Sequence, residues 1–310
     1  MTGNANVQEA VRIAQTPWPY RVMFGCGLAI LLFAIAAGLV FSFSKDGSLP
    51  GLSIREQADV LSLIEQQNHE QAIAQMRLLL QIQGPGSVAN ETDLRGKLGE
   101  LLLNAGDLDE AIEHLLRCVE LNPQAMGVHN NLGAAYLRKN DLAKAALEFE
   151  RELRINPGHG PASTNLGSLL RMQGRLDDAI VCFEHAARTD PQMVEPQLSL
   201  GIVYSQQDKP DLAAEHLKKA LRIDPQNTQA HINLGNVYWR QGKPELALEH
   251  MNHALRNYPY DATVHNNIGL ILQQQGRVGE AVNYFQEAVK IDPTFTAARH
   301  NLANATQSAR

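Results

Sequence analysis

Hydrophobic positions recur every 34 residues over most of this chain. Seven apolar residues keep that step, at Leu98, Leu132, Leu166, Leu200, Leu234, Ile268 and Leu302. A glycine follows each of the first six, and six prolines keep the same step, at Pro123, Pro157, Pro191, Pro225, Pro259 and Pro293. A period of roughly 20 to 50 residues is typical of a solenoid, in which each unit buries its apolar face against its neighbours. The pattern predicts an array of one copied unit that offers a binding surface rather than an active site.

Each unit is predicted to contain two helices. In the first helix the apolar residue before the glycine recurs four residues later on the same face, as Leu132 does with Tyr136. This helix is expected to end at residues that tolerate the left-handed conformation: Gly106, Asn140, Gly174, Asp208, Gly242 and Gly276. We expect the second helix to begin with a capping box at Asp107 and Glu110 in one unit, and with Pro210 or Pro244 in two others.

The inward face of the second helix carries alanines 34 residues apart, at Ala111, Ala145, Ala179, Ala213, Ala247 and Ala281. A glycine inside the first helix costs about 1 kcal/mol relative to alanine, which predicts that a second backbone approaches it closely, with these alanines opposite. Larger residues stand four positions on and are expected to fill the gap between units: Leu115, Phe149, Phe183, Leu217, Met251 and Phe285. Glu152 replaces a small residue of the pattern, and we expect its charge to reach solvent.

This arrangement resembles the tetratricopeptide repeat, whose 34-residue pattern of Leu-Gly, Tyr, Ala, Phe, Ala and Pro is matched at nearly all of these positions. The resemblance implies an all-α fold, a right-handed superhelical solenoid of antiparallel helix pairs similar to that of the O-linked N-acetylglucosamine transferase. It covers residues 92–295 as six full repeats, with residues 296–310 as a C-terminal capping helix. Residues 54–91 resemble a degenerate capping repeat, because Ala72 lies in a helix-like stretch that no Leu-Gly pair precedes.

The N-terminal part has a different character. A tail, residues 1–21, precedes residues 22–43, which form an uncharged stretch of 22 residues, and residues 44–53 carry the Gly, Pro and Ser of a linker. As a helix, residues 22–43 would span about 33 Å, enough for a bilayer core of about 30 Å. We therefore predict a single transmembrane helix. The alternatives are a buried core helix, which normally has only about 10 to 14 apolar residues, and a cleaved signal peptide, whose apolar region is about 7 to 15 residues long.

Cytoplasmic flanks of a membrane helix are usually the more positive, but here the count is equal. Arg12 and Arg21 precede the helix, and Lys45 and Arg55 follow it. We favour a bacterial inner-membrane protein with a short tail inside and the repeats extracytoplasmic.

Composition argues against several classes of function. The net charge of −6 and the pI of about 6.0 do not fit a nucleic-acid-binding protein. The three cysteines have no metal-ligand spacing. His129, His231 and His265 recur in register, and His250 and His253 share a helix face with Glu249, but neither set completes a metal site. No nucleophile motif, phosphate loop or carboxylate pair is present, so we predict no catalytic residue, no cofactor and no enzyme activity.

Candidate binding residues stand just before the Leu-Gly pairs, at Asn131, Asn165, Asn233, Asn267 and Asn301, with Lys97 and Ser199 at the two places that break the run. They lie opposite the packed seam of the first helix. The resemblance implies that this side lines a concave groove, where similar asparagines of the O-linked N-acetylglucosamine transferase hold a bound peptide by its backbone. An amide offers both a donor and an acceptor, so it can pair with a peptide bond whatever the neighbouring side chains are. The alternative is that these asparagines only solvate an exposed helix face.

Two further groups are expected to face the same groove. Arg138, Arg171 and Arg240 join Lys97 and favour acidic peptides, although solvated arginines are the alternative. An apolar group is expected to anchor a partner's side chain, unless it serves ordinary packing between helices: Leu198, Ile202, Ile232, Trp239 and Leu270. The carboxylate clamp of heat-shock co-chaperones is not predicted, because only Asn236 with Asn267 fits it.

These observations together predict a membrane-anchored scaffold that binds extended segments of partner proteins for the assembly of an envelope complex. The first alternative is a targeting or accessory subunit of a transferase. A spacer or self-assembling module without a ligand is the other.

Overall fold

The computed structural model describes residues 69–82 and 88–308, and the chain divides into two compact units between residues 87 and 88. The first unit is described only through α4 (His69–Ile82). The tail, the transmembrane helix predicted at 22–43 and the linker lie outside the described residues. Among the helices that are described, none combines the length and the apolar character that a membrane crossing requires.

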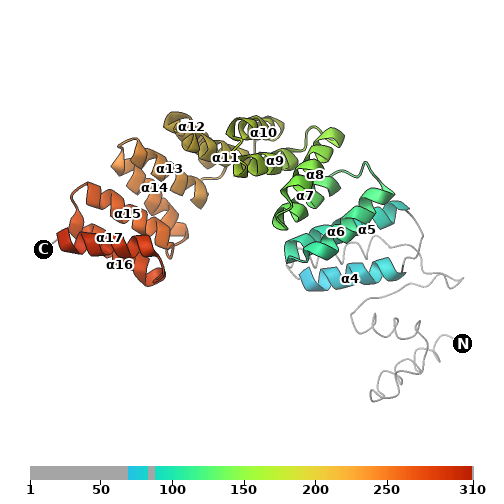
Figure 1. The fold of residues 1–310 in the computed structure, drawn as a ribbon, viewed down its shortest axis with the longest axis horizontal. Coiled ribbons are helices and arrows are strands. Elements are labelled where there is room, and N and C mark those ends of the chain that lie inside the picture. The colour runs from blue at the N-terminus through green and yellow to red at the C-terminus, as the bar shows by residue number, and fades with distance from the viewer. Residues whose placement is uncertain (1–68, 83–87, 309–310) are drawn as a thin grey trace, which may run out of the picture. The chain divides into compact units, whose positions relative to one another are not determined.

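The second unit is a series of helix pairs followed by one more helix, α17 (Thr296–Ser308) (Figure 1). The first helices of the pairs are α5 (Val88–Ala105), α7 (Val128–Arg138), α9 (Gly160–Met172), α11 (Val194–Gln206), α13 (Thr228–Arg240) and α15 (Ala262–Gln274). The second helices are α6 (Leu108–Leu121), α8 (Leu142–Ile155), α10 (Leu176–Thr189), α12 (Pro210–Ile223), α14 (Pro244–Asn257) and α16 (Val278–Ile291). The described residues form no strand, which confirms the all-α repeat array. Helix α5 begins at Val88, upstream of the start predicted at residue 92.

The turns inside the pairs are where the pattern placed them. All six predicted residues have a positive φ, including the two that are not glycine, Asn140 at 61° and Asp208 at 58°. Pro210 and Pro244 open α12 and α14 as expected. The capping box at Asp107 was a wrong prediction, because this side chain accepts no hydrogen bond from α6. The Asp107 backbone carbonyl instead accepts a bond from the Ala111 N–H, at 2.9 Å.

The glycine of each first helix makes room for a large side chain of the second. A Cβ atom on Gly133 would lie 2.5 Å from a ring carbon of Phe149, and one on Gly269 would lie 2.5 Å from a ring carbon of Phe285. The predicted close approach of the two helices is thus confirmed. Phe149 is fully buried and belongs to the same core cluster as Leu166 of the following pair. The large residue therefore fills the interior of its own pair and also the junction with the next.

Glu152 is completely buried, contrary to the expectation that its charge reaches solvent. Its Oε1 atom accepts a hydrogen bond from the backbone N–H of Gly127 at 2.8 Å, and its Oε2 atom accepts one from Asn130 at 3.4 Å. These N–H groups belong to the first turn of α7, which has no carbonyl partners of its own and favours negative charge. The carboxylate is therefore satisfied by the start of the first helix in its own pair rather than by water.

Three histidines come together between α13 and α14. His231 is buried, its Nδ1 atom lies 2.9 Å from Nδ1 of His250, and its ring stacks on His253 with centroids 4.7 Å apart. Burial lowers the pKa of His250 to about 4, with the neighbouring His231 as the next cause. No group of three His, Cys, Asp or Glu side chains within 69–82 and 88–308 is arranged to hold a metal ion. These histidines pack the helix pair, and His250 is a neutral ring near neutral pH.

The glycine contacts predict opposite effects of one substitution at two places. Gly133→Ala should lower the free energy of unfolding by about 1 to 3 kcal/mol, because the added methyl overlaps the Phe149 ring and overpacking outweighs the gain in helix propensity. Gly279→Ala in α16 is the matched control, since nothing lies within 4 Å of its added Cβ, and should raise stability by up to about 1 kcal/mol. Urea unfolding followed by circular dichroism measures both, and equal changes would contradict the packing described.

The histidine cluster predicts a loss of stability in mild acid. Unfolded His250 takes up a proton near pH 6.5, whereas in the folded protein its pKa is about 4, so the unfolded state binds more protons between these values. The contribution of neutral His250 is fully present above pH 6.5 and is lost as the pH falls toward 4. The melting temperature of His250→Gln should therefore fall less between pH 7 and pH 4 than that of the wild type. His300→Gln on exposed α17 should leave the wild-type pH dependence unchanged.

Candidate functional site

The first helices of successive repeats lie against one another and form one side of the array. Direct contacts join α5 with α7, α7 with α9, α9 with α11, α11 with α13, and α15 with α17. All five asparagines of the predicted row are on these first helices or on α17, and all five are half-buried. Lys97 on α5 and Ser199 on α11 are half-buried as well. The structure thus places the predicted row on the helices that share this side.

Amide side chains connect neighbouring helices along this row. The Nδ2 atom of Asn165 donates to Oδ1 of Asn130 at 2.9 Å, which joins α9 to α7. Asn301 donates in the same way to Asn266 at 2.8 Å and joins α17 to α15. In a third connection, Nδ2 of Asn267 lies 3.3 Å from Oδ1 of Asn236 on α13. In each case the donor is a predicted residue and the acceptor belongs to the preceding first helix.

Two of the three acceptor residues, Asn130 and Asn266, were missed by the sequence reasoning. Asn130 and Asn266 each stand directly before a predicted asparagine, so the doubled Asn at 130–131 and 266–267 was an available signal. Asn165 and Asn301, which donate to these two residues, each carry a side-chain oxygen of their own. Among the described residues, Oδ1 of Asn165 accepts no hydrogen bond, and the same holds for Asn301. Each helix connection therefore leaves a carbonyl oxygen that can accept an N–H from another chain.

The remaining two asparagines bond locally. Asn233 donates from Nδ2 to the backbone carbonyl of Gln229 in its own helix, at 2.8 Å. Asn131 accepts a weak bond from the adjacent Asn130, at 3.4 Å. The row consists of connected sections at α7–α9 and α13–α17, separated at α11 by Ser199.

Most of the predicted groove cations are engaged within the fold. Arg138 donates from Nη1 to the carbonyl of Leu103 in the last turn of α5. Arg240, three repeats later, donates in the same way from Nη1 to the carbonyl of Ser205 in the last turn of α11, at 3.0 Å. A helix C-terminus has unpaired carbonyls and favours positive charge, so both arginines cap the preceding first helix. Lys97 pairs with Asp93 at 3.0 Å. Arg171 is half-buried and forms no ion pair with the described residues.

The predicted apolar anchor is continuous with the core. All five of its residues are half-buried. Leu198, Ile232, Trp239 and Leu270 pack against the buried cluster of α12 to α17. The indole N–H of Trp239 donates to the side-chain oxygen of Gln274, which joins α13 to α15. These contacts are those of ordinary packing between helices, which was the alternative interpretation of this group. That the group anchors a partner's side chain stays a prediction.

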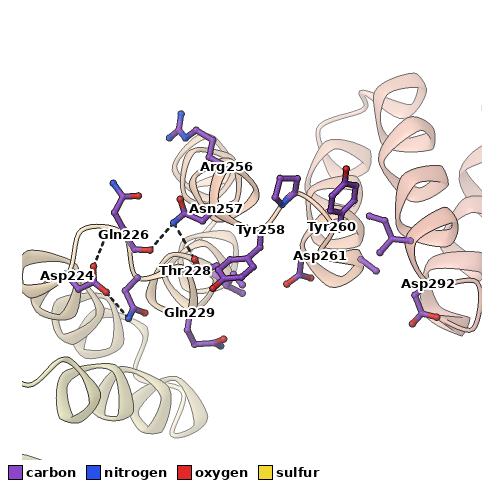
Figure 2. Close-up of a pocket in the computed structure, with 15 residues that line it drawn as sticks. Asp224, Gln226, Thr228, Gln229, Arg256, Asn257, Tyr258, Tyr260, Asp261 and Asp292 are labelled. Atoms are coloured by element: carbon purple, nitrogen blue, oxygen red, sulfur yellow. Dashed lines mark hydrogen bonds between the residues drawn. The ribbon is translucent and has the colours of Figure 1, made fainter. Parts of the chain in front are cut away.

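Two hollows open along the repeats. One, of about 700 Å³, brings Lys97 and Asn131 together with the carboxylates of Asp93 and Glu100. The other, of about 1290 Å³, lies at the turns before α13 and α15, and Ile232 is the one residue of the predicted site that lines it (Figure 2). Only the first hollow therefore unites charged and amide residues of the predicted row.

The described cysteines are not activated nucleophiles. Burial raises the pKa of the Cys118 thiol to about 11, and the thiol donates to the backbone carbonyl of Thr92 at 2.8 Å. Burial also raises the pKa of Cys182. Both thiols stay protonated near neutral pH, and the thiolate is the reactive form.

Comparison with solved structures shows the same fold in proteins of low sequence identity. PilF of Pseudomonas aeruginosa aligns with a TM-score of 0.64 and 18% identity over 70% of this chain and 99% of its own. A tetratricopeptide repeat protein of Parabacteroides merdae aligns with a TM-score of 0.59 and 16% identity over 81% of this chain and 98% of its own. YrrB, described as a TPR protein with an unusual peptide-binding site, aligns with a TM-score of 0.52 and 21% identity over 61% of this chain and 97% of its own. A search of curated protein sequences gave no match.

Family models identify the repeats directly. Models described as tetratricopeptide repeat match residues 97–160, 161–193 and 226–294, and a model described as TPR repeat matches residues 209–242. Together these matches span more than half of the chain's 310 residues. The helix pairs, the left-handed turns and the glycine contacts agree with them. The chain belongs to the tetratricopeptide repeat family.

Proposed function

We propose that this protein is a scaffold that holds extended segments of partner proteins against its first helices. The observation that carries the proposal is the row of amides in register, which joins the first helices and leaves Oδ1 atoms of Asn165 and Asn301 without a partner among the described residues. The family supports a role in protein interaction, since its fold is typically a scaffold without catalytic activity. The peptide-binding site named for YrrB supports the same class of ligand.

The connections between amides prepare the row for binding. Because Nδ2 of Asn165 is held by Asn130, its Oδ1 atom is fixed in direction before a ligand arrives. An acceptor that is already ordered loses less conformational entropy on binding. A backbone N–H of an extended chain is a suitable donor for it, and such bonds are independent of the ligand's side chains. The proposed scaffold therefore accepts segments of varied sequence.

We further propose that residues 22–43 anchor the scaffold in a bacterial inner membrane, with the repeats extracytoplasmic, where they hold components of an envelope complex. The support is the length of the uncharged stretch relative to a bilayer core. A scaffold fixed at the membrane raises the effective concentration of a bound segment near other membrane components.

Backbone recognition is tested with peptides selected on the full chain from a random 12-residue library. Replacing Asn165 and Asn301 together with Ala should weaken peptide affinity about tenfold, as expected for the loss of two hydrogen bonds. Methylation of the contacted backbone nitrogens in the peptide should weaken binding to the wild type to a similar degree. Titration calorimetry measures both effects.

A matched variant separates binding from helix connection. Asn130→Ala with Asn266→Ala breaks the same two bonds between helices but keeps the two proposed acceptors. It should bind the peptides within about threefold of the wild type, because the lost bonds orient the two acceptors but do not contact the peptide. Equal loss in both variants, or no effect of backbone methylation, would contradict recognition through the amide row.

The proposed topology is tested by protease added to spheroplasts. The repeats should be digested, because the proposed orientation exposes them outside, while a cytoplasmic marker protein stays intact. Full protection of the repeats that ends only when detergent is added would reverse the proposed orientation. Recovery of the full chain in the soluble fraction after lysis would contradict the anchor.

A further inference from the structure

One of the turns between repeats departs from the pattern of the others. Each second helix is followed by a turn, and in five of these turns an Asn or Asp side chain accepts a hydrogen bond from the backbone N–H two residues later. These residues are Asn122, Asn156, Asp190, Asp224 and Asp292. Tyr258 occupies this place between α14 and α15. The hydroxyl of Tyr258 is at the far end of its ring and cannot accept from the backbone N–H two residues later. This turn therefore lacks a stabilising interaction that its five counterparts possess.

The same turn exposes two aromatic rings. Tyr258 is 64% exposed and Tyr260 is 84% exposed, on either side of Pro259. At the place of Tyr260 the other turns have small or polar residues: Gln124, Gly158, Gln192, Gln226 and Thr294. Tyrosine exposed in this way is typical of binding surfaces, because it brings a large apolar area and a hydrogen-bonding group at low entropic cost. The turn therefore has features of a contact site rather than of a connection.

The rings border the larger of the two hollows, of about 1290 Å³ (Figure 2). Its lining includes the carboxylates of Asp224, Asp261 and Asp292, and one cationic group, the guanidinium of Arg256. Three negative charges against one positive charge give the lining a net charge of −2. Asp224 and Asp292 also follow the C-terminal ends of α12 and α16, where helix carbonyls add negative potential. The hollow is complementary to a cation.

An anion would compete with side chains that already cap the nearby helix starts. The helices that start at this hollow are α13 and α15, and a side chain caps each of them. Asn227 accepts from the N–H of Ala230 at 2.9 Å, and Asp261 accepts from the N–H of Val264 at 3.0 Å. With one first-turn donor of each helix occupied and three carboxylates in the lining, the hollow disfavours phosphate or carboxylate ligands.

We propose that the Tyr258–Tyr260 turn and the adjoining hollow bind an arginine side chain in an extended segment of a partner protein. A planar guanidinium stacks on a tyrosine face and at the same time donates to carboxylates, which fits this lining better than a compact ammonium does. Asp224 and Asp292 lie on either side of the rings (Figure 2) and add negative charge to the hollow. The site uses none of the asparagines of the amide row, so it stands independently of the proposed function.

Neighbouring repeats supply the variants for the test. Tyr258→Asn with Tyr260→Gln recreates the uncharged turn found before α7, which keeps the fold and removes both rings. Asp224→Asn with Asp292→Asn removes two charges but keeps a side-chain acceptor like that of Asn122 and Asn156. Asp190→Asn is the matched control, since Asp190 makes the same turn outside the hollow. Melting temperatures verify that each full-length variant is folded.

The probes are two random peptide libraries that differ only in a central residue, Arg in one and Glu in the other. Wild type should retain the Arg-centred library and yield peptides that bind at low salt, measured by fluorescence anisotropy. Removal of both rings should weaken these peptides about tenfold, and removal of two carboxylates about fivefold with a shallower salt dependence. Asp190→Asn should stay within about twofold of the wild type.

Three results would overturn the proposal. The first is equal retention of the Glu-centred library, which would remove the preference for a cation. The second is unchanged affinity of the Arg-centred peptides when both rings are replaced in a folded variant. The third is loss of these peptides only in Asn165→Ala with Asn301→Ala, which would assign their binding to the amide row. Failure of the amide row with these peptides still bound would leave the arginine site standing.

Discussion

The structure depends on the contact between each first-helix glycine and the large side chain that enters its space. Phe149 would collide with any side chain at position 133, so the two helices reach their separation only because glycine is there. This contact fixes each pair as a rigid unit, and the same Phe149 belongs to the core cluster shared with the following pair. Since every pair has the same geometry, one position of the first helix always faces the same side. The amide row is in register for this reason.

Features set by local chemistry could be predicted from the sequence, and those set by contact between helices could not. The ends of the first helices were predictable because a left-handed residue must stand there, and Asn140 and Asp208 tolerate that conformation. The burial of Glu152 was not predictable from the pattern, because it depends on donors at the start of α7, the facing helix of its own pair. Likewise the place of Asn165 on its helix could be predicted, but its bond to Asn130 depends on the distance between neighbouring helices.

The amides of the candidate site both connect neighbouring helices and offer an acceptor to a ligand. This double role explains why they are only half-buried. A fully buried amide would need partners for both its donor and its acceptor. A fully exposed amide would be disordered and would lose entropy on binding. Asn301 lies between these limits, because its donor is held by Asn266 while its acceptor has no partner among the described residues. Arg138 and Arg240 show the other outcome, since their bonds to the preceding helix ends commit them to the fold.

Two departures from the repeat pattern can be compared by what compensates them. Glu152 replaces a small residue, and the cost of burying its charge is offset inside the molecule by N–H donors of α7. Tyr258 replaces a turn-forming Asn or Asp, and the described part of the chain offers nothing in return, since its ring and that of Tyr260 remain exposed. A local rule broken with internal compensation is a variation of packing. One broken without it is expected at a functional surface, where the compensation comes from a second molecule.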